Sequence, residues 1–72
     1  MNISLNEEIA DRIKELRNIE GLTQFELAKK LNISRSVLAK YETAAGIPSI
    51  PVLVDLAKFF RVSTDYILGL VD

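Results

Sequence analysis

Four polar side chains in the middle of the chain have types and spacing suited to recognition chemistry. Ser34, Arg35 and Ser36 open a short amphipathic stretch, and Lys40 follows on the same face of a helix. An arginine can donate two parallel hydrogen bonds to a pair of acceptors, and a serine can both donate and accept. Polar groups of this kind are not expected in a hydrophobic core, so we expect a partner outside the fold to bind them.

Catalytic chemistry is not expected from this composition. The 72 residues include no histidine and no cysteine, which removes the usual general base, the commonest metal ligand and the thiolate nucleophile. The carboxylates are scattered over predicted helix faces, and no nucleophile stands beside a base. We therefore expect a protein that is not an enzyme, with no cofactor, no metal and no evident small-molecule ligand.

The charge is unevenly distributed along the chain. The net charge is −1, yet residues 21–46 carry four Lys/Arg against two Asp/Glu, while the segments on either side are acidic. No apolar run approaches the roughly 20 residues that a membrane span needs. Absence of cysteine suits a reducing compartment. These features predict a soluble, cytoplasmic protein whose only basic segment holds the polar side chains named above.

Helix signals cover the whole chain, which is short enough for one domain over residues 1–72. Capping boxes Ser4-x-x-Glu7 and Thr23-x-x-Glu26 predict helices over about 5–19 and 24–31. Ser34 caps a third helix over about 35–42, and further helices are predicted after Pro48-Ser49-Ile50-Pro51 and after Ser63. No strand pattern competes, so the sequence predicts an all-α fold with five helices.

The second and third predicted helices have the spacing of a helix-turn-helix at about residues 24–42. A small residue, Ala28, allows two helices to cross closely, and Asn32 tolerates the left-handed turn between them. The apolar positions that complete the pattern are Leu27, Leu31, Ile33, Leu38 and Tyr41. An ordinary corner between two helices without a ligand is the alternative, because the pattern alone is degenerate.

Two longer stretches extend this pattern to nearly the whole chain. With IADRIKELRNIEGLTQFELAKKLNISRSVLAKYE and PSIPVLVDLAKFFRVSTDYILG, the sequence resembles the Cro and lambda-repressor-like (XRE-type) helix-turn-helix DNA-binding domains. The resemblance implies a compact five-helix lambda-repressor-like domain. It also implies sequence-specific binding of double-stranded DNA through the major groove by a transcriptional regulator, most often a repressor of phage or bacterial type. An ion pair between Arg17 and Glu42 is implied as well, although two unconnected surface charges are the alternative.

The outward face of the third helix supplies the expected DNA contacts. Arg35 suits the O6 and N7 atoms of guanine, Ser36 suits several bases, and Lys40 reaches a base or a phosphate. Val37 is either a partly buried flank or a contact to a thymine methyl group. The residues expected at phosphates are Thr23, Gln24, Ser34 and Thr43. Lys29 and Lys30 are expected to be a solvated face.

The segment after the third helix departs from the family pattern. The family usually has a glycine stop there and one or more basic residues that clamp phosphate, whereas this chain has the uncharged segment Thr43-Ala44-Ala45-Gly46-Ile47. A modest affinity with a shallow salt dependence is expected. The departure leaves open a different function, that of an antitoxin-like or anti-repressor interaction module with weak or no DNA binding.

The chain is expected to pair with a second copy, in solution or only on DNA. One helix makes too few base contacts to specify a genomic site, and pairing doubles them. The expected seam lies at the end of the chain, at Tyr66, Leu70 and Val71. In the alternative, Tyr66 and Leu70 only close the core over the first helix.

Overall fold

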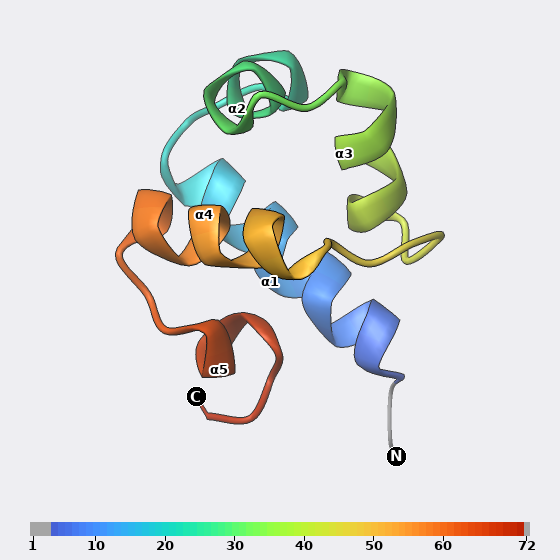
Figure 1. Ribbon diagram of the computed structural model, residues 1–72, viewed down its shortest axis with the longest axis vertical. Coiled ribbons are helices and arrows are strands. Elements are labelled where there is room, and N and C mark those ends of the chain that lie inside the picture. The colour runs from blue at the N-terminus through green and yellow to red at the C-terminus, as the bar shows by residue number, and fades with distance from the viewer. Residues whose placement is uncertain (1–3, 72) are drawn as a thin grey trace.

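Five helices make up the fold, and the prediction of an all-α fold is confirmed. The structure is a computed structural model that describes residues 4–71, so both ends of the predicted domain, residues 1–3 and 72, lie outside the described residues. In chain order the helices are α1 (Leu5–Ile19), α2 (Gln24–Leu31), α3 (Arg35–Glu42), α4 (Ile50–Phe60) and α5 (Thr64–Ile67) (Figure 1). The predicted bounds of the first three agree with those observed.

A serine or threonine hydroxyl starts each helix. The hydroxyl accepts a hydrogen bond from the backbone N–H three residues later, which otherwise has no partner in the first turn. The caps are Ser4, Thr23, Ser34, Ser49 and Ser63. Both predicted capping boxes are complete, because the glutamates of α1 and α2 also accept from the cap backbone. Helix starts are therefore encoded locally in this sequence.

Left-handed residues end several helices. Gly21 (φ +70°) follows α1, and Asn32 (φ +58°) joins α2 to α3 at the left-handed turn that the sequence predicted. Ala44 (φ +64°) and Arg61 (φ +58°) adopt the same region without being glycine or asparagine. This conformation brings the Cβ atom too close to the carbonyl oxygen, so both residues carry local strain.

The core forms where all five helices meet. Its buried members are Ile9, Ile13, Leu16, Leu27, Ala28, Leu31, Leu38, Leu53, Leu56, Ala57 and Ile67. Of the apolar residues of α1, Ile9, Ile13 and Leu16 are buried, whereas Leu5 and Ile19 at the ends of the helix are exposed. Ala28 of α2 is almost completely buried, and α2 packs against both α3 and α4.

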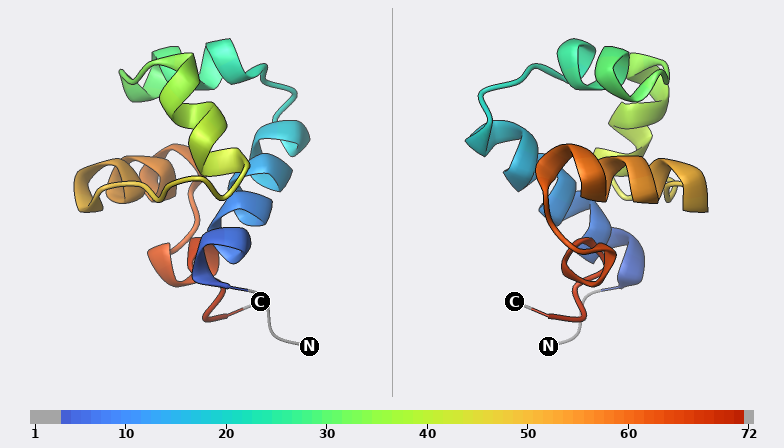
Figure 2. Two further views of the ribbon diagram at one scale, coloured as in Figure 1. Left: turned by 90° about the vertical axis from the view of Figure 1, so that its right-hand side faces the viewer. Right: turned by 60° about the vertical axis from the view of Figure 1, so that its left-hand side comes forward.

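The arrangement leaves α2 and α3 together at one end of the molecule. Helix α3 packs against α1 and α2, while α5 packs against α1 and α4. Figure 2 shows α2 and the start of α3 at the end opposite α5. Any surface built from the starts of α2 and α3 is therefore remote from the end of the chain.

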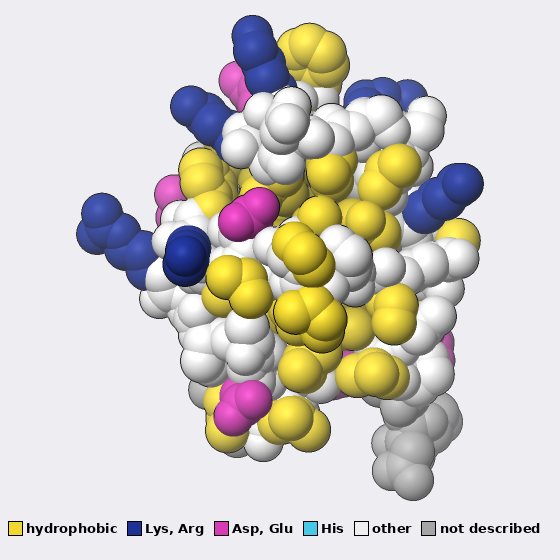
Figure 3. Space-filling view, in the orientation of Figure 1, with side chains coloured by type: hydrophobic (Ala, Val, Ile, Leu, Met, Phe, Trp, Pro, Cys, Tyr) yellow, Lys and Arg dark blue, Asp and Glu magenta, His cyan; other side chains and the backbone are white. Residues whose placement is uncertain are grey.

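Helix α4 is apolar around most of its circumference. Its sequence, IPVLVDLAKFF, has one acidic and one basic residue, and Ile50 at its start is exposed. Figure 3 shows hydrophobic side chains gathered over α4 in the middle of one face, with lysine and arginine side chains along the upper rim. Within residues 4–71, no helix combines the length and the hydropathy that crossing a membrane requires.

Candidate nucleic-acid interface

The first turns of α3 present the predicted polar face to solvent. Leu38 is fully buried and anchors the helix, whereas Arg35, Ser36 and Lys40 are exposed on the other side. Val37 is half-buried, which agrees with its interpretation as a flank of the core. The core contacts of α3 thus decide which side chains a ligand can reach.

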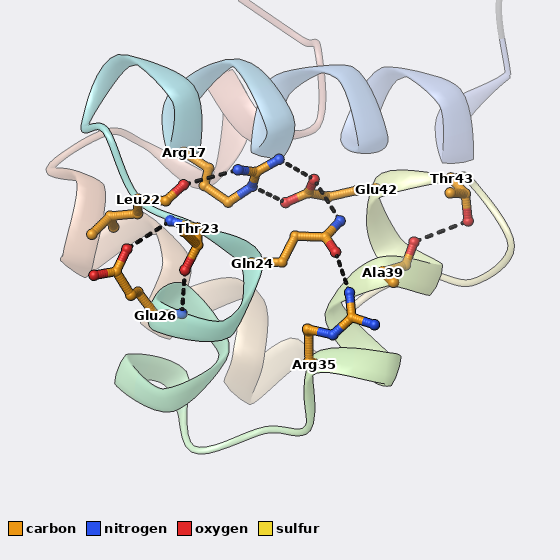
Figure 4. A network of polar contacts seen from close by, with 9 residues as sticks. All are labelled: Arg17, Leu22, Thr23, Gln24, Glu26, Arg35, Ala39, Glu42 and Thr43. Carbon is orange, nitrogen blue, oxygen red and sulfur yellow. Dashed lines mark hydrogen bonds and ion pairs between the residues drawn. The ribbon is translucent and has the colours of Figure 1, made fainter.

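Gln24, at the start of α2, joins this surface to α3. Nη1 of Arg35 donates to Oε1 of Gln24 at 3.0 Å, and Nε2 of Gln24 donates to Oε1 of Glu42 at 3.2 Å. Gln24 therefore lies between the first and the last residue of α3 (Figure 4). The predicted base contact Arg35 and the predicted phosphate contact Gln24 touch each other.

Arg17 and Glu42 form a buried ion pair that ties α1 to the end of α3. Nε and Nη2 of Arg17 donate to the two carboxylate oxygens of Glu42 at 2.7 and 2.9 Å, and Nη1 donates to the carbonyl of Leu22 at 2.8 Å. The Glu42 side chain is 2% exposed and that of Arg17 is 14% exposed. Hydrogen bonding to Glu42 raises the pKa of Arg17 above its ordinary value, although burial opposes the shift. The pair is bidentate.

Two of the hydroxyls predicted at phosphates keep a proton to donate. Thr23 and Ser34 accept from the backbone N–H groups of Glu26 and Val37, so their own hydroxyl protons remain available. The backbone N–H groups of residues 24 and 25 lie in the first turn of α2, where a helix has no internal acceptor for them. Such groups suit an anion.

Thr43 is placed differently from these two hydroxyls. Its Oγ1 lies 2.9 Å from the carbonyl oxygen of Ala39 and 3.3 Å from that of Lys40, so its single hydroxyl proton is directed at the backbone. A phosphate has no proton to offer in return. Contact between Thr43 and a phosphate requires the hydroxyl to turn away from α3.

The side chains after α3 add no charge to this surface. Ala44 adopts the left-handed region (φ +64°), and the uncharged segment continues to Ile47. Lys29 and Lys30 are exposed near the end of α2.

The residues predicted at a dimer seam have different surroundings. Leu70 and Val71 are 69% and 49% exposed. Tyr66 is half-buried beside the core, donates from its hydroxyl to Glu15 at 3.1 Å and carries the guanidinium of Arg12 4.4 Å from its ring centre. Tyr66 thus closes the fold against α1, whereas the two aliphatic residues face solvent.

Sequence reasoning missed two of these contacts. The amide of Gln24 was expected at a phosphate, and its bridge between Arg35 and Glu42 has no local pattern, since the bonded residues are 11 and 18 positions apart. The stacking of Arg12 on Tyr66 joins α1 to α5 across the whole chain. Only knowledge of how the helices pack could have found either contact.

Known proteins share both the sequence pattern and the fold. The uncharacterized HTH-type transcriptional regulator YobD of Bacillus subtilis is 43% identical over 61 residues, which cover 85% of this chain and 54% of that protein. The HTH-type transcriptional regulator ImmR of the same species is also 43% identical over 61 residues, covering 85% and 48%. The chain therefore spans about half the length of these relatives.

A solved structure and a family model agree with these relatives. The crystal structure of a transcriptional regulator from Listeria innocua has a TM-score of 0.82 and 30% identity, and the match covers 89% of this chain and 60% of that one. The helix-turn-helix family model matches residues 13–67, from the middle of α1 to the end of α5. This chain belongs to the XRE-type helix-turn-helix family.

Proposed function

We propose that the protein binds double-stranded DNA sequence-specifically, with α3 in the major groove, and regulates transcription. The observation that carries the proposal is the exposed Arg35 at the start of α3, beside an amide and two free backbone N–H groups of α2. Family membership supports it, as does the similarity to YobD and ImmR, which are named HTH-type transcriptional regulators. The activity is binding rather than catalysis.

Base recognition is assigned to the outward face of α3. Arg35 donates to O6 and N7 of a guanine, which no other base pair presents in the same pattern in the major groove. Ser36 adds a donor and an acceptor for a neighbouring base. Lys40 is further along the helix and contacts a base or a phosphate.

Phosphate contacts are assigned to the starts of the two helices. Gln24, Thr23 and Ser34 offer uncharged donors, and helix starts favour anions. Thr43 joins them only if its hydroxyl turns outward. Since Lys and Arg contacts set the salt dependence of binding, and the segment after α3 has none, affinity falls only gently with salt.

Repression is the proposed outcome of binding, because occupancy of a site that overlaps a promoter is enough to exclude other proteins. Activation would require an additional contact with the transcription machinery. We also propose a cytoplasmic location, because a bacterial regulator of this kind works where the DNA lies.

We further propose a homodimer on a two-fold symmetric operator, with half-sites about one helical turn apart. Leu70 and Val71 offer the exposed apolar surface, while Tyr66 contributes through the part of its ring left open by Arg12. The apolar face of α4 is the competing seam. Sedimentation with a palindromic duplex separates them: Leu70→Glu abolishes pairing if the tail is the seam, and Ile50→Glu abolishes it if α4 is.

The function is tested by selecting bound duplexes from a random pool at low salt. A recurring sequence motif is expected, and Arg35→Ala should relax the choice at one base pair at a cost of about 1–3 kcal/mol on the selected site. Lys58→Ala, which removes an exposed positive charge in the last turn of α4, is the matched control. A pool that stays random would contradict DNA recognition and favour the protein-interaction module, for which the uncharged segment after α3 and the apolar face of α4 speak.

A further inference from the structure

We infer that the outer face of α2 is a docking surface for an acidic segment of a partner protein, with Phe25 as the apolar anchor. The surface, which we call the α2 groove, is an open groove of about 690 Å³ lined by Leu22, Phe25, Glu26, Lys29 and Lys30. The proposed function assigns no DNA contact to any of these residues. The inference therefore goes beyond that function and does not depend on it.

Phe25 is the most exposed apolar member of the α2 groove. It is 64% exposed, whereas three other residues form the buried side of the helix. Within residues 4–71 the stacked aromatic pair is Phe59 with Phe60, so the ring of Phe25 has no aromatic partner there. A phenylalanine buries on the order of 150–250 Å² when it is covered. This area is available to a partner, and aromatic residues are enriched in protein interfaces.

The apolar floor of the α2 groove extends beyond Phe25. Leu22 is partly buried and packs against the core, so the floor rests on a fixed part of the fold. Lys29 follows Phe25 by four residues and shares its face of the helix. The lysine stems add methylene groups to the floor while their amino groups stay in water. A single exposed apolar residue needs no explanation, but here several apolar groups adjoin in one groove.

The charges around this floor favour an acidic partner. Oε1 of Glu26 accepts a hydrogen bond from the backbone N–H of Thr23 at 2.8 Å, so the one carboxylate of the groove is engaged within the protein (Figure 4). The ion pairs found within residues 4–71 do not include Lys29 or Lys30. The α2 groove therefore presents two unpaired positive charges beside an apolar floor.

The spacing of these groups describes the segment that fits them. An aliphatic or aromatic side chain covers Phe25, and carboxylates lie about one helical turn further along, at Lys29 and Lys30. An amphipathic helix offers this arrangement, because residues three or four positions apart lie on one face. The apolar contact supplies most of the affinity, whereas the charges at the rim select the partner and speed its association.

Two other occupants fit the α2 groove less well. A DNA backbone would pair its phosphates with the lysines, but phosphates need donors, which Leu22 and Phe25 lack. A second copy of the chain would bring its acidic first helix, and the contact would then join two different surfaces. Such a contact does not close into a two-fold dimer and leads to open chains of molecules.

The experiment selects ligands from a displayed library of random peptides, on the folded protein and without DNA. The enriched peptides are expected to share acidic residues within one helical turn of an aliphatic or aromatic residue. Their Kd is then measured by fluorescence anisotropy. Phe25→Ala should weaken binding by at least about 10-fold, the effect of losing a central anchor. Alanine is a good helix former, so this variant should fold, which a thermal melt checks.

Matched variants on α4 show whether the effect belongs to the α2 groove. Ile50→Ala removes an apolar side chain that is 72% exposed and should leave the Kd unchanged. Lys29→Gln combined with Lys30→Gln should weaken binding by about 2- to 20-fold at low salt and by less at high salt. Lys58→Gln removes an exposed charge from the last turn of α4 and should change nothing.

Several results would overturn the inference. Enriched peptides without acidic residues, or an unchanged Kd in Phe25→Ala, would show that the α2 groove does not bind this chemistry. A loss in Ile50→Ala instead would assign docking to the face of α4. Self-association that disappears in Phe25→Ala, measured by sedimentation, would make a second copy the occupant. An equal loss of affinity for every duplex in Phe25→Ala, with no peptide enriched, would make it the DNA backbone. The peptide measurements contain no DNA, so their outcome is separate from that of operator recognition.

Discussion

Replacing Glu42 by alanine is expected to destabilise the fold far more than a typical loss of one carboxylate. The substitution leaves the guanidinium of Arg17, which is 14% exposed, with only the carbonyl of Leu22 as a partner. Breaking a buried pair by removing one partner costs about 3–5 kcal/mol, because the other charge remains desolvated and uncompensated.

This cost is large for a domain of this size. Seventy-two residues correspond to a total stability of about 4–11 kcal/mol. Each kcal/mol lowers the melting temperature of such a domain by about 4–8 °C, so a loss of at least about 12 °C is expected. The free energy of unfolding is measured by urea denaturation and by thermal melts followed by circular dichroism, both without DNA.

Two further variants show whether the ion pair is the cause. Glu20→Ala removes an exposed carboxylate at the end of α1 and should change stability by less than about 0.5 kcal/mol. Arg17→Met combined with Glu42→Leu removes both charges and should recover part of the loss, because an apolar pair needs no compensation. An unchanged melting temperature for Glu42→Ala would refute the reasoning, since the pair would then contribute no more than a surface contact.

Three smaller perturbations follow from the backbone and the caps. Ala44→Gly should raise the free energy of unfolding by about 0.5–1 kcal/mol in urea denaturation, because it relieves a left-handed alanine; no gain would mean no strain there. Gly69→Ala should lower the free energy of unfolding more than Gly21→Ala does. Both glycines have positive φ, but only a Cβ atom at residue 69 would overlap a side chain, that of Glu8. Equal losses of stability would contradict this. The backbone N–H of the α2 cap lowers the pKa of Glu26 below its ordinary 4.5. The ionised Glu26 therefore stabilises the fold above pH 4.5, and this stabilisation is lost as the pH falls through the folded pKa. Glu26→Gln should flatten that part of a plot of stability against pH, and an unchanged plot would exclude the effect.

The parts of the fold that could be predicted are those encoded over short distances. Hydroxyl caps and the glutamate of a capping box lie within four residues of each other, so the starts of α1 and α2 are readable from Ser4 and Thr23. Asn32 was predicted at the left-handed turn for a similar reason, since its side chain tolerates that conformation. By contrast, nothing in the types of Ala44 and Arg61 predicts their positive φ.

The sequence predicts which residues belong to the site better than it predicts which of them touch each other. Helical spacing separates Arg35 from the buried Leu38, which is enough to place Arg35 on the outer face. It cannot say that Gln24 touches Arg35, because that contact depends on the angle at which α2 crosses α3. Nor can it say that Tyr66 is held by Arg12, which limits how far this ring can serve a partner.

Arg35 is hydrogen-bonded to a residue of α2. Helix α3 alone is therefore not a complete unit for transfer to another protein. A graft that transfers only the outward side chains of α3 to another scaffold would carry the arginine without the amide that holds it. Gln24 can hold residue 35 only if that residue donates a hydrogen bond to Oε1 of Gln24. A replacement at position 35 that only accepts hydrogen bonds would face this oxygen without forming a bond. New specificity in this scaffold is therefore expected to arise through paired changes at positions 24 and 35, with Glu42 retained as the common anchor.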